Sequence, residues 1–259
     1  MKVIILAGGY GTRLSEETEL RPKPMVEIGG YPIIYHIMKI YSHYGFNDFI
    51  IALGYKGYFI KEYFANYLLH NSDVSIDLPE NKIEILNKRA ENWKVTLVDT
   101  GLDTQTGGRI KRLQTLIGKN RFMLTYGDGV SNVDIHELLK FHESHNKYVT
   151  VTAVKPGGKY GQLEIDDGNE VRTFMEKPPD DGSWVNGGFF VLEPKAFDYI
   201  DSDETIWESA PLEKLASEGQ LLAYKHYGFW KCMDTLKDKR DLERMWLSEN
   251  AKWAVWAKK

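Results

Sequence analysis

The chain lacks the features that mark several classes of protein. Cys232 is the only cysteine among 259 residues, so an internal disulfide is excluded, and no histidine stands near it at the spacing of a zinc site. The apolar run near the start, residues 3–6, meets glycines at once and is too short for a signal peptide or a membrane span. These absences favour a cytoplasmic protein without a membrane partner.

Long blocks of like charge are also missing. The 33 lysines and arginines nearly balance the 37 aspartates and glutamates, which leaves a net charge of -4. A protein that binds nucleic acid or a membrane surface would gather its basic residues, so neither partner is expected. Small anionic ligands remain compatible with this charge pattern.

What the chain does contain is an alternation of two hydrophobic patterns. Continuous apolar runs, typical of strands buried on both faces of a parallel sheet, are separated by apolar residues at helical spacing. The runs cover residues 3–7, 49–53, 95–98 and 122–126, and the helical patterns cover 33–41, 60–68, 110–117 and 135–139. Strands that alternate with helices predict βαβ units. We therefore expect an α/β fold with a Rossmann-like, mostly parallel mixed sheet flanked by helices.

The pattern changes after residue 154. Residues 162–165 and 170–175 flank an Asp-Asp-Gly-Asn turn and predict a β-hairpin. Further strands are predicted at 189–192 and 221–226, and helices at 211–219 and 236–247.

These elements suggest one domain, 1–259, with internal parts. We expect a core of about 1–155 and 215–245, a smaller lobe of about 156–214 and a C-terminal helical tail of about 236–259. Trp246, Trp253 and Trp256 lie in the tail. They are expected to dock on the parent domain, with a subunit contact as the alternative.

A glycine-rich segment follows the first strand directly. In Leu6-Ala7-Gly8-Gly9-Tyr10-Gly11-Thr12-Arg13-Leu14, glycines let backbone N–H groups approach phosphate oxygens, while Thr12 and Arg13 add a hydroxyl and a fixed cation. The segment lacks the third glycine of the dinucleotide fingerprint, and no Lys-Ser or Lys-Thr follows as a P-loop requires. A phosphate loop of another kind is predicted, and a plain tight turn is the alternative.

Lys23 lies shortly downstream in Arg21-Pro22-Lys23-Pro24-Met25. Two prolines stiffen the backbone around it. A lysine held in this way could neutralise a phosphate at little cost in side-chain entropy. Taken alone it would instead be a solvated surface lysine.

Together these segments resemble the amino-terminal signature of the sugar nucleotidyltransferase family. The resemblance continues along nearly the whole chain, through Tyr126-Gly127-Asp128-Gly129, Glu176-Lys177-Pro178 and Val185-Asn186-Gly187-Gly188-Phe189-Phe190-Val191. Three further stretches are similar to the glucose-1-phosphate cytidylyltransferase branch: Val98-Asp99-Thr100-Gly101 with Thr106-Gly107-Gly108-Arg109, Gly127-Asp128-Gly129-Val130, and Gly228-Phe229-Trp230 with Met233-Asp234-Thr235.

The resemblance implies a magnesium site made by Asp128 and Asp234. Two carboxylates with phosphate oxygens suit a hard cation, and Asp128 follows a buried strand, where ligands of open α/β sheets gather. Each aspartate has a local alternative, because Gly-Asp-Gly also makes turns and Asp234 could cap the helix that starts near Leu236.

The resemblance also implies the remaining site residues. Arg13, Lys23 and Asp128 would be catalytic. The nucleotide would contact Leu6, Ala7, Gly8, Gly9, Tyr10, Gly11, Thr12, Arg13, Lys23, Thr104, Gly108, Arg109 and Asp128, and the sugar phosphate would contact Glu176, Lys177, Asn186, Gly187 and Gly188 in the smaller lobe. Cytosine is implied because the Thr104 to Arg109 loop departs from the Gln and Pro pattern of thymidylyl and uridylyl relatives. For Arg109 the alternative is a surface position on a helix over 107–117.

The implied reaction joins CTP to α-D-glucose 1-phosphate with Mg²⁺, giving CDP-glucose and pyrophosphate, within CDP-dideoxysugar synthesis for a bacterial O-antigen polysaccharide. A homo-oligomer, a hexamer by resemblance, is also implied. The alternatives are the same reaction with UTP, dTTP or ATP, a nucleotide-sugar sensor without activity, and a nicotinamide-dependent oxidoreductase, which the failed fingerprint disfavours. No histidine forms a defensible nucleophile-and-base pair.

Overall fold

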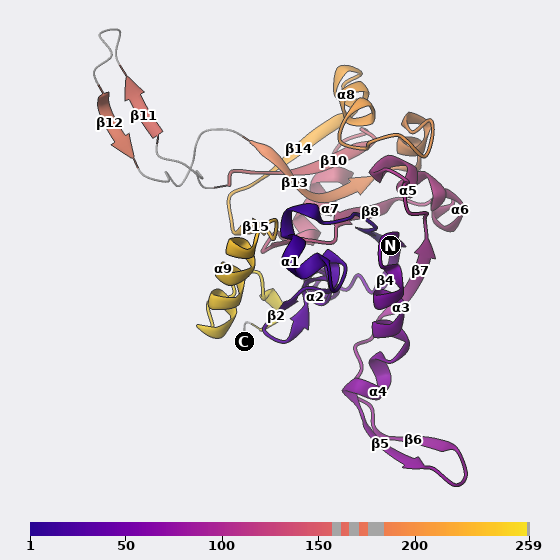
Figure 1. Cartoon of the computed structure of the whole chain (residues 1–259). Coiled ribbons are helices and arrows are strands. Elements are labelled where there is room, and N and C mark those ends of the chain that lie inside the picture. The colour runs from indigo at the N-terminus through magenta and orange to yellow at the C-terminus, as the bar shows by residue number, and fades with distance from the viewer. Residues whose placement is uncertain (157–161, 166–170, 176–183, 258–259) are drawn as a thin grey trace.

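A mixed seven-stranded sheet organises the molecule (Figure 1). The computed structural model describes residues 1–156, 162–165, 171–175 and 184–257. In sheet order, the strands are β14 (Leu221–His226), β10 (Val149–Val154), β13 (Val185–Leu192), β8 (Phe122–Tyr126), β1 (Lys2–Ala7), β4 (Asp48–Leu53) and β7 (Lys94–Asp99). Strand β13 runs antiparallel to both of its neighbours, and every other adjacent pair is parallel. The expected α/β fold is confirmed.

Helices cover both faces of this sheet. Ile4 of β1 points into a core shared with α5 (Thr106–Arg112), α6 (Gln114–Ile117) and α8 (Ala210–Ser217). Its neighbours Val3 and Ile5 point into the opposite core, made with α2 (Ile33–His43), α3 (Gly57–Ala65), α7 (Ile135–Glu143) and α9 (Leu236–Leu247). Because successive strand residues face opposite sides, a strand covered on both faces needs an apolar residue at every position.

Two expectations about the strands were wrong. Strand β7, which spans the run predicted at 95–98, is only partly buried, because it pairs with β4 alone at the edge of the sheet. Strand β13 lies inside the central sheet, although the smaller lobe was expected to reach from 156 to 214. Phe197 and Trp207 of the same range are buried in the core. Sequence order alone does not reveal that the chain returns to the sheet within that range.

Several predicted helices are shorter than expected. The helical pattern at 60–68 divides into α3 and α4 (Tyr67–Asn71), and the pattern at 110–117 divides into α5 and α6. The remaining helical turns are α1 (Ser15–Thr18), η1 (Thr12–Leu14), η2 (Lys23–Met25), η3 (Pro194–Tyr199) and η4 (Val255–Ala257).

In the described part of the chain, four strand pairs stand outside the main sheet. They are β2 (Glu27–Ile28) with β3 (Tyr31–Pro32), β5 (Asp73–Asp77) with β6 (Lys82–Asn87), β9 (Gly129–Ser131) with β15 (Trp230–Cys232), and β11 (Gln162–Ile165) with β12 (Val171–Met175). The antiparallel β11–β12 pair confirms the predicted hairpin strands, while the predicted turn at 166–169 lies outside the described residues. No sequence pattern predicted the β5–β6 hairpin, which projects beyond α4 (Figure 1).

The C-terminal segment packs on the parent core, as expected. Trp253 is buried and donates from Nε1 to Nδ1 of His36 on α2. Trp246 covers Gly29, where the φ of 59° and a Cβ only 2.0 Å from the indole Nε1 would both disfavour a larger residue. The segment after β15 therefore closes one face of the molecule.

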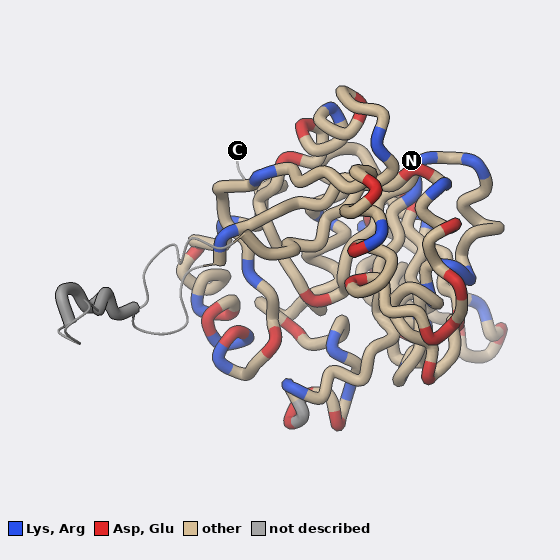
Figure 2. The backbone as a smooth tube through the Cα atoms, turned by 90° about the horizontal axis from the view of Figure 1, so that it is seen from above, with Lys and Arg blue, Asp and Glu red and all other residues tan. Residues whose placement is uncertain are grey.

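Basic and acidic residues are interspersed along the part of the chain that Figure 2 colours. Within the described residues, none of the helices is both long enough and apolar enough to span a bilayer.

Candidate active site

A cavity of about 500 Å³ opens at the carboxyl ends of β1 and β8. This volume suits a small organic ligand. Its walls are made by Leu6, Ala7, Gly8, Gly9, Tyr10, Gly11, Thr12, Arg13, Lys23, Pro24, Leu102, Asp103, Thr104, Gln105, Thr106, Arg109, Tyr126, Gly127, Asp128 and Asp234. The structure thus brings together every residue expected at the nucleotide except Gly108, and both expected metal ligands.

Two glycines of the loop after β1 have different surroundings. Gly11 has a φ of 66°, and a Cβ there would lie 2.8 Å from Cγ2 of Thr18, so protein packing alone requires glycine. A Cβ on Gly9 would meet none of the described atoms within 4 Å. The backbone at Gly9 is therefore open to a ligand in the cavity.

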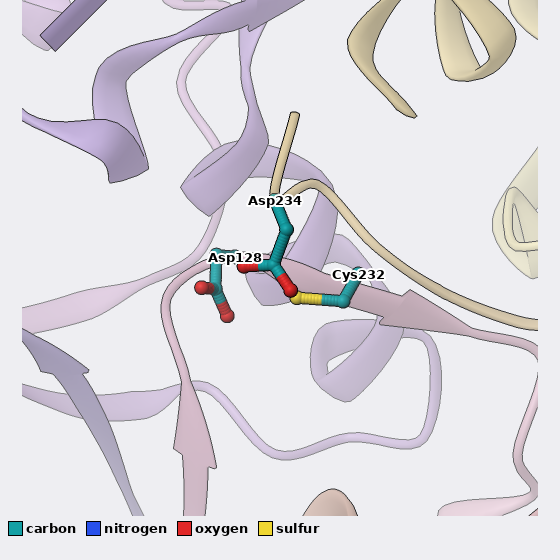
Figure 3. Close-up of side chains that lie close together, drawn as sticks. All are labelled: Asp128, Cys232 and Asp234. Carbon is teal, nitrogen blue, oxygen red and sulfur yellow. The ribbon is translucent and has the colours of Figure 1, made fainter. Parts of the chain in front are cut away.

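Lys23 joins the two aspartates. Its Nζ donates to Oδ2 of Asp128 and to Oδ1 of Asp234, at 2.7 Å in each case. Arg13, from the glycine loop, reaches one of these aspartates, with Nη1 3.2 Å from Oδ2 of Asp234. Figure 3 shows the two carboxylates together with the Cys232 thiol, and one ligand atom of each of these three residues lies within 4.8 Å of the others.

Strand pairing brings these distant residues together. Asp128 lies in the turn between β8 and β9, and the pairing of β9 with β15 places Cys232 opposite Gly129. The backbone N–H of Met233 then donates to the carbonyl of Asp128 at 2.9 Å. Asp234 therefore emerges beside Asp128.

The alternative role of Asp234 as a helix cap is excluded. The N-cap of α9 is Thr235, which forms a capping box with Asp238. The Asp234 carboxylate is left to face Lys23 and Arg13.

Electrostatics holds the Lys23 cluster in its ionised form. Burial alone would lower the pKa of Lys23, but the carboxylates, Asp128 foremost, raise it overall. Burial acts to raise the pKa of Asp234, yet Lys23 and Arg13 hold it below its usual value. Burial raises the pKa of the Cys232 thiol, and the neighbouring Asp128 carboxylate raises it further. The cluster is thus a cation between two carboxylates, beside a neutral thiol.

Arg109 is buried, so its alternative as a surface residue was wrong. Only 4% of the residue is exposed. Its guanidinium donates to the carbonyls of Gly8, Leu53, Gly101 and Leu102 and to Oγ1 of Thr100. The Arg109 side chain forms part of the cavity wall, and its Nη groups are hydrogen-bonded to other residues of the chain.

Gly108 does not line the cavity, in contrast to the expectation. A Cβ there would lie 2.5 Å from the backbone of Asp203, so this glycine allows α5 to pack on the neighbouring loop. Thr104 does line the cavity, and a Cβ on Gly101 would lie 2.7 Å from its Oγ1.

Sequence reasoning missed several polar residues of the cavity, Asp103 and Tyr126 among them. The Tyr10 hydroxyl donates to Oδ1 of Asp103 at 3.0 Å, which joins the glycine loop to the segment after β7. Tyr126 ends β8, and burial followed by nearby Glu208 raises the pKa of its phenol. Its place at the carboxyl end of a predicted strand was a usable signal, whereas nothing in the sequence marked Asp103.

Three of the expected sugar phosphate residues, Asn186, Gly187 and Gly188, lie beside the cavity rather than in its wall. Asn186 donates from Nδ2 to the Tyr126 hydroxyl at 3.1 Å and accepts from the N–H of Gly188 at 2.9 Å. Gly187 accepts from Nε1 of Trp230 at 2.7 Å. Glu176 and Lys177 lie outside the described residues.

Comparison with known proteins decides the family. A family profile described as "Nucleotidyl transferase" matches residues 2–235. The chain belongs to the nucleotidyl transferase family. This nucleotidyltransferase is therefore an enzyme, and the resemblance found in its motifs is confirmed.

Individual relatives of this nucleotidyltransferase match over almost their full length. The glucose-1-phosphate cytidylyltransferase of Salmonella typhi is 56% identical over 257 residues, which cover 99% of this chain and 100% of the relative. A probable glucose-1-phosphate cytidylyltransferase of Bacillus subtilis (strain 168) is 45% identical with the same coverage. A solved UDP-glucose pyrophosphorylase from Acinetobacter baumanii has a TM-score of 0.70 at 16% identity and covers 98% of this chain and 96% of its own, which shows the common fold.

Proposed function

We propose that this nucleotidyltransferase transfers a cytidylyl group from CTP to α-D-glucose 1-phosphate. The observation that carries the proposal is the joining of Asp128 and Asp234 by Lys23 beside the glycine loop, at the wall of a ligand-sized cavity. The choice of CTP and glucose 1-phosphate is supported by the names of relatives that are 45% to 56% identical over the whole chain.

We propose Mg²⁺ as the cofactor, held by Asp128 and Asp234. Both carboxylates already converge on one cation, because each has an oxygen 2.7 Å from the Lys23 ammonium. Oxygen donors suit a hard divalent cation. When bound, such an ion would supply Lewis-acid stabilisation of charge on the phosphates.

The protein's main task in this reaction is to reduce repulsion between anions. A phosphate oxygen of the sugar attacks the α-phosphorus of CTP, the bond between that phosphorus and the bridging oxygen breaks, and pyrophosphate leaves with the bond electrons. Two unit charges ~4 Å apart at an effective dielectric of ~20 repel by ~4 kcal/mol. Arg13 and Lys23, whose side chains face the cavity, would neutralise the triphosphate, and the glycine loop would offer N–H donors.

The sugar phosphate is proposed to bind between the cavity and the smaller lobe. Asn186 lies there with its amide on the Tyr126 hydroxyl, and Tyr126 lines the cavity. The roles proposed for Glu176 and Lys177 rest on the family motif alone. We also propose a cytoplasmic location and a place in CDP-dideoxysugar synthesis for a surface polysaccharide.

Pyrophosphate release tests the substrate choice. Purified protein would be given glucose 1-phosphate, Mg²⁺ and one of CTP, UTP, dTTP or ATP. Release with CTP alone is expected. Release with another triphosphate only would overturn the choice of base, and binding of nucleotide without release from any would favour the sensor alternative.

We further propose that the chain forms a homo-oligomer, a hexamer by resemblance. The β5–β6 hairpin supports association, because Ile76 pairs with Ile83 and both are more than half exposed. A two-stranded hairpin is marginally stable in water unless something covers its apolar face. Analytical ultracentrifugation of the chain and of Ile76→Lys would test this, and an unchanged sedimentation coefficient would remove the hairpin from the interface.

A further inference from the structure

Arg109 connects the ends of three neighbouring strands that lead into the cavity. Strands β1, β4 and β7 are adjacent and parallel. Gly8 directly follows β1, Leu53 ends β4, and the segment of Gly101 and Leu102 follows β7. The Nη1 and Nη2 groups of Arg109 donate to the carbonyls of all four residues, at 2.6 to 3.1 Å.

Only an arginine has the donors for this arrangement. A guanidinium presents a planar fork of N–H groups, whereas a lysine ammonium is a single point with three donors. In the chain, the fork spans the Gly8 carbonyl on one side and the Gly101 carbonyl on the other. The Gly8 contact is the one that reaches the phosphate loop itself.

Gly8 lies so close to the Arg109 guanidinium that the residue type at one position restricts the residue type at the other. A Cβ on Gly8 would lie 2.4 Å from both Cζ and Nη1 of Arg109, well inside van der Waals contact. The φ of Gly8 is not in the left-handed region, so space beside Arg109, rather than backbone freedom, requires glycine here. A free arginine side chain could move aside to make room for a Cβ. Here the guanidinium of Arg109 is held in place by its hydrogen bonds to four carbonyls.

We propose that Arg109 is a positioning residue that locks the phosphate loop at Gly8 onto the ends of β4 and β7, and that Gly8 is glycine to admit this lock. The inference rests on the proposed function, since it sets where the loop meets the triphosphate. It assigns Arg109 an effect on the nucleotide that passes through the backbone of Gly8.

A double-mutant cycle tests the lock. CTP affinity and melting temperature would be measured for Gly8→Ala, Arg109→Ala and the pair. Gly8→Ala is expected to weaken CTP binding by about tenfold or more in the wild-type background but by less than about twofold beside Arg109→Ala, because contacting residues couple. Gly9→Ala is the matched control, since its Cβ meets none of the described atoms, and its effect should be equal in both backgrounds.

A second measurement separates positioning from simple loss of folding. Millimolar guanidinium is expected to restore part of the CTP affinity of Arg109→Ala and none of that of Arg13→Ala, and Arg109→Lys should bind as weakly as Arg109→Ala. Additive effects of Gly8→Ala and Arg109→Ala, or loss confined to CTP while the other triphosphates bind unchanged, would overturn the lock. If wild-type protein bound no CTP, the substrate proposal would fail, while coupling in the melting temperatures would still support the lock.

Discussion

Arg13 and Arg109 line the same cavity, yet their surroundings differ completely. The Arg13 side chain is 76% exposed, and its Nη1 lies 3.2 Å from the Asp234 carboxylate. Arg109 is 4% exposed and donates to four backbone carbonyls and a hydroxyl. The first arginine can turn to a substrate, while the second must give up bonds within the chain to do so.

The same distinction applies to other polar groups. Lys23 resembles Arg13, because its partners are carboxylates that a divalent cation could also bind. His36 resembles Arg109, since both ring nitrogens are occupied by the chain: Nε2 lies 2.9 Å from the carbonyl of Ile28, and Nδ1 accepts from Trp253. A polar group whose partners are charged side chains is a candidate for catalysis or ligand binding. A polar group whose partners belong to the backbone is a candidate for a structural role.

Removing Lys23 should have the largest effect. Lys23→Met keeps the length of the side chain but removes the cation, so turnover is expected to fall by roughly three powers of ten, corresponding to ~4 kcal/mol. Folding should change little. Lys39→Met is the matched control, because Lys39 forms a 2.7 Å ion pair with Glu91 on another part of the molecule. Near-normal turnover of Lys23→Met, measured as pyrophosphate release, would remove Lys23 from the mechanism.

Exchanging each arginine for lysine should change the unfolding free energy of the protein by very different amounts at the two positions. Arg109→Lys is expected to lower the free energy of unfolding by about 3 kcal/mol, because carbonyls lose their donors in a buried setting. Arg13→Lys should change it by less than about 0.5 kcal/mol, as for most exposed positions. Urea unfolding of both variants measures this difference. Equal losses of unfolding free energy in the two variants would show that burial does not distinguish the role of Arg109 from that of Arg13.

Acidification should act on the buried histidine. Burial lowers the pKa of His36 to about 4 from its ordinary 6.5, and a second ring proton would face the Trp253 donor. The unfolded chain therefore takes up the proton first, so stability is present above pH ~6.5 and is lost as pH falls toward ~4, with a loss of about 2 kcal/mol at pH ~5.

The variant His36→Gln tests that assignment, because glutamine can still donate to Ile28 but does not titrate. Its unfolding free energy should depend less on pH between neutrality and pH ~5 than that of the wild type. His142, whose pKa burial also lowers to about 4, contributes to the dependence that remains, as do His145 and His226, whose pKa values burial lowers too. Identical pH profiles for the two proteins would show that His36 does not contribute.

Truncating Arg13 should have a smaller effect on ligand binding than removing Lys23 has on turnover. Arg13→Ala is expected to weaken triphosphate binding by about tenfold, or ~1.4 kcal/mol, and to leave the melting temperature nearly unchanged. The loss should shrink at high salt, since the side chain is exposed. Titration with CTP at two ionic strengths measures it, and a salt-independent loss would indicate a buried contact instead.

Local pattern predicted much of the fold. The apolar run of residues 3–7 and the helical spacing of 135–139 each correspond to an observed element, because burial requires those periods. Patterns did not reveal that β13 returns to the centre of the sheet or that β7 lies at its edge. Both depend on which strands pair, and pairing is decided between segments far apart in the chain.

Within the cavity, the sequence singled out the glycine loop, Lys23 and the two aspartates by residue type and by resemblance. It also placed Gly108 among the nucleotide contacts, whereas the structure packs that glycine against Asp203. Residue type says what a side chain can donate or accept. Whether its neighbours already satisfy it depends on contacts that only the folded chain makes.

By itself, then, the sequence determined the class of fold, the presence of the glycine loop after the first strand and the membership of the nucleotidyl transferase family, because periodicity and motif spacing are local properties. Only the tertiary structure decided that Asp234 meets Asp128 through the pairing of β15 with β9. It also decided that Arg109 faces carbonyls while Arg13 faces the cavity. The physical reason is that burial and the choice of hydrogen-bond partner arise from packing between distant segments, which one-dimensional order does not specify.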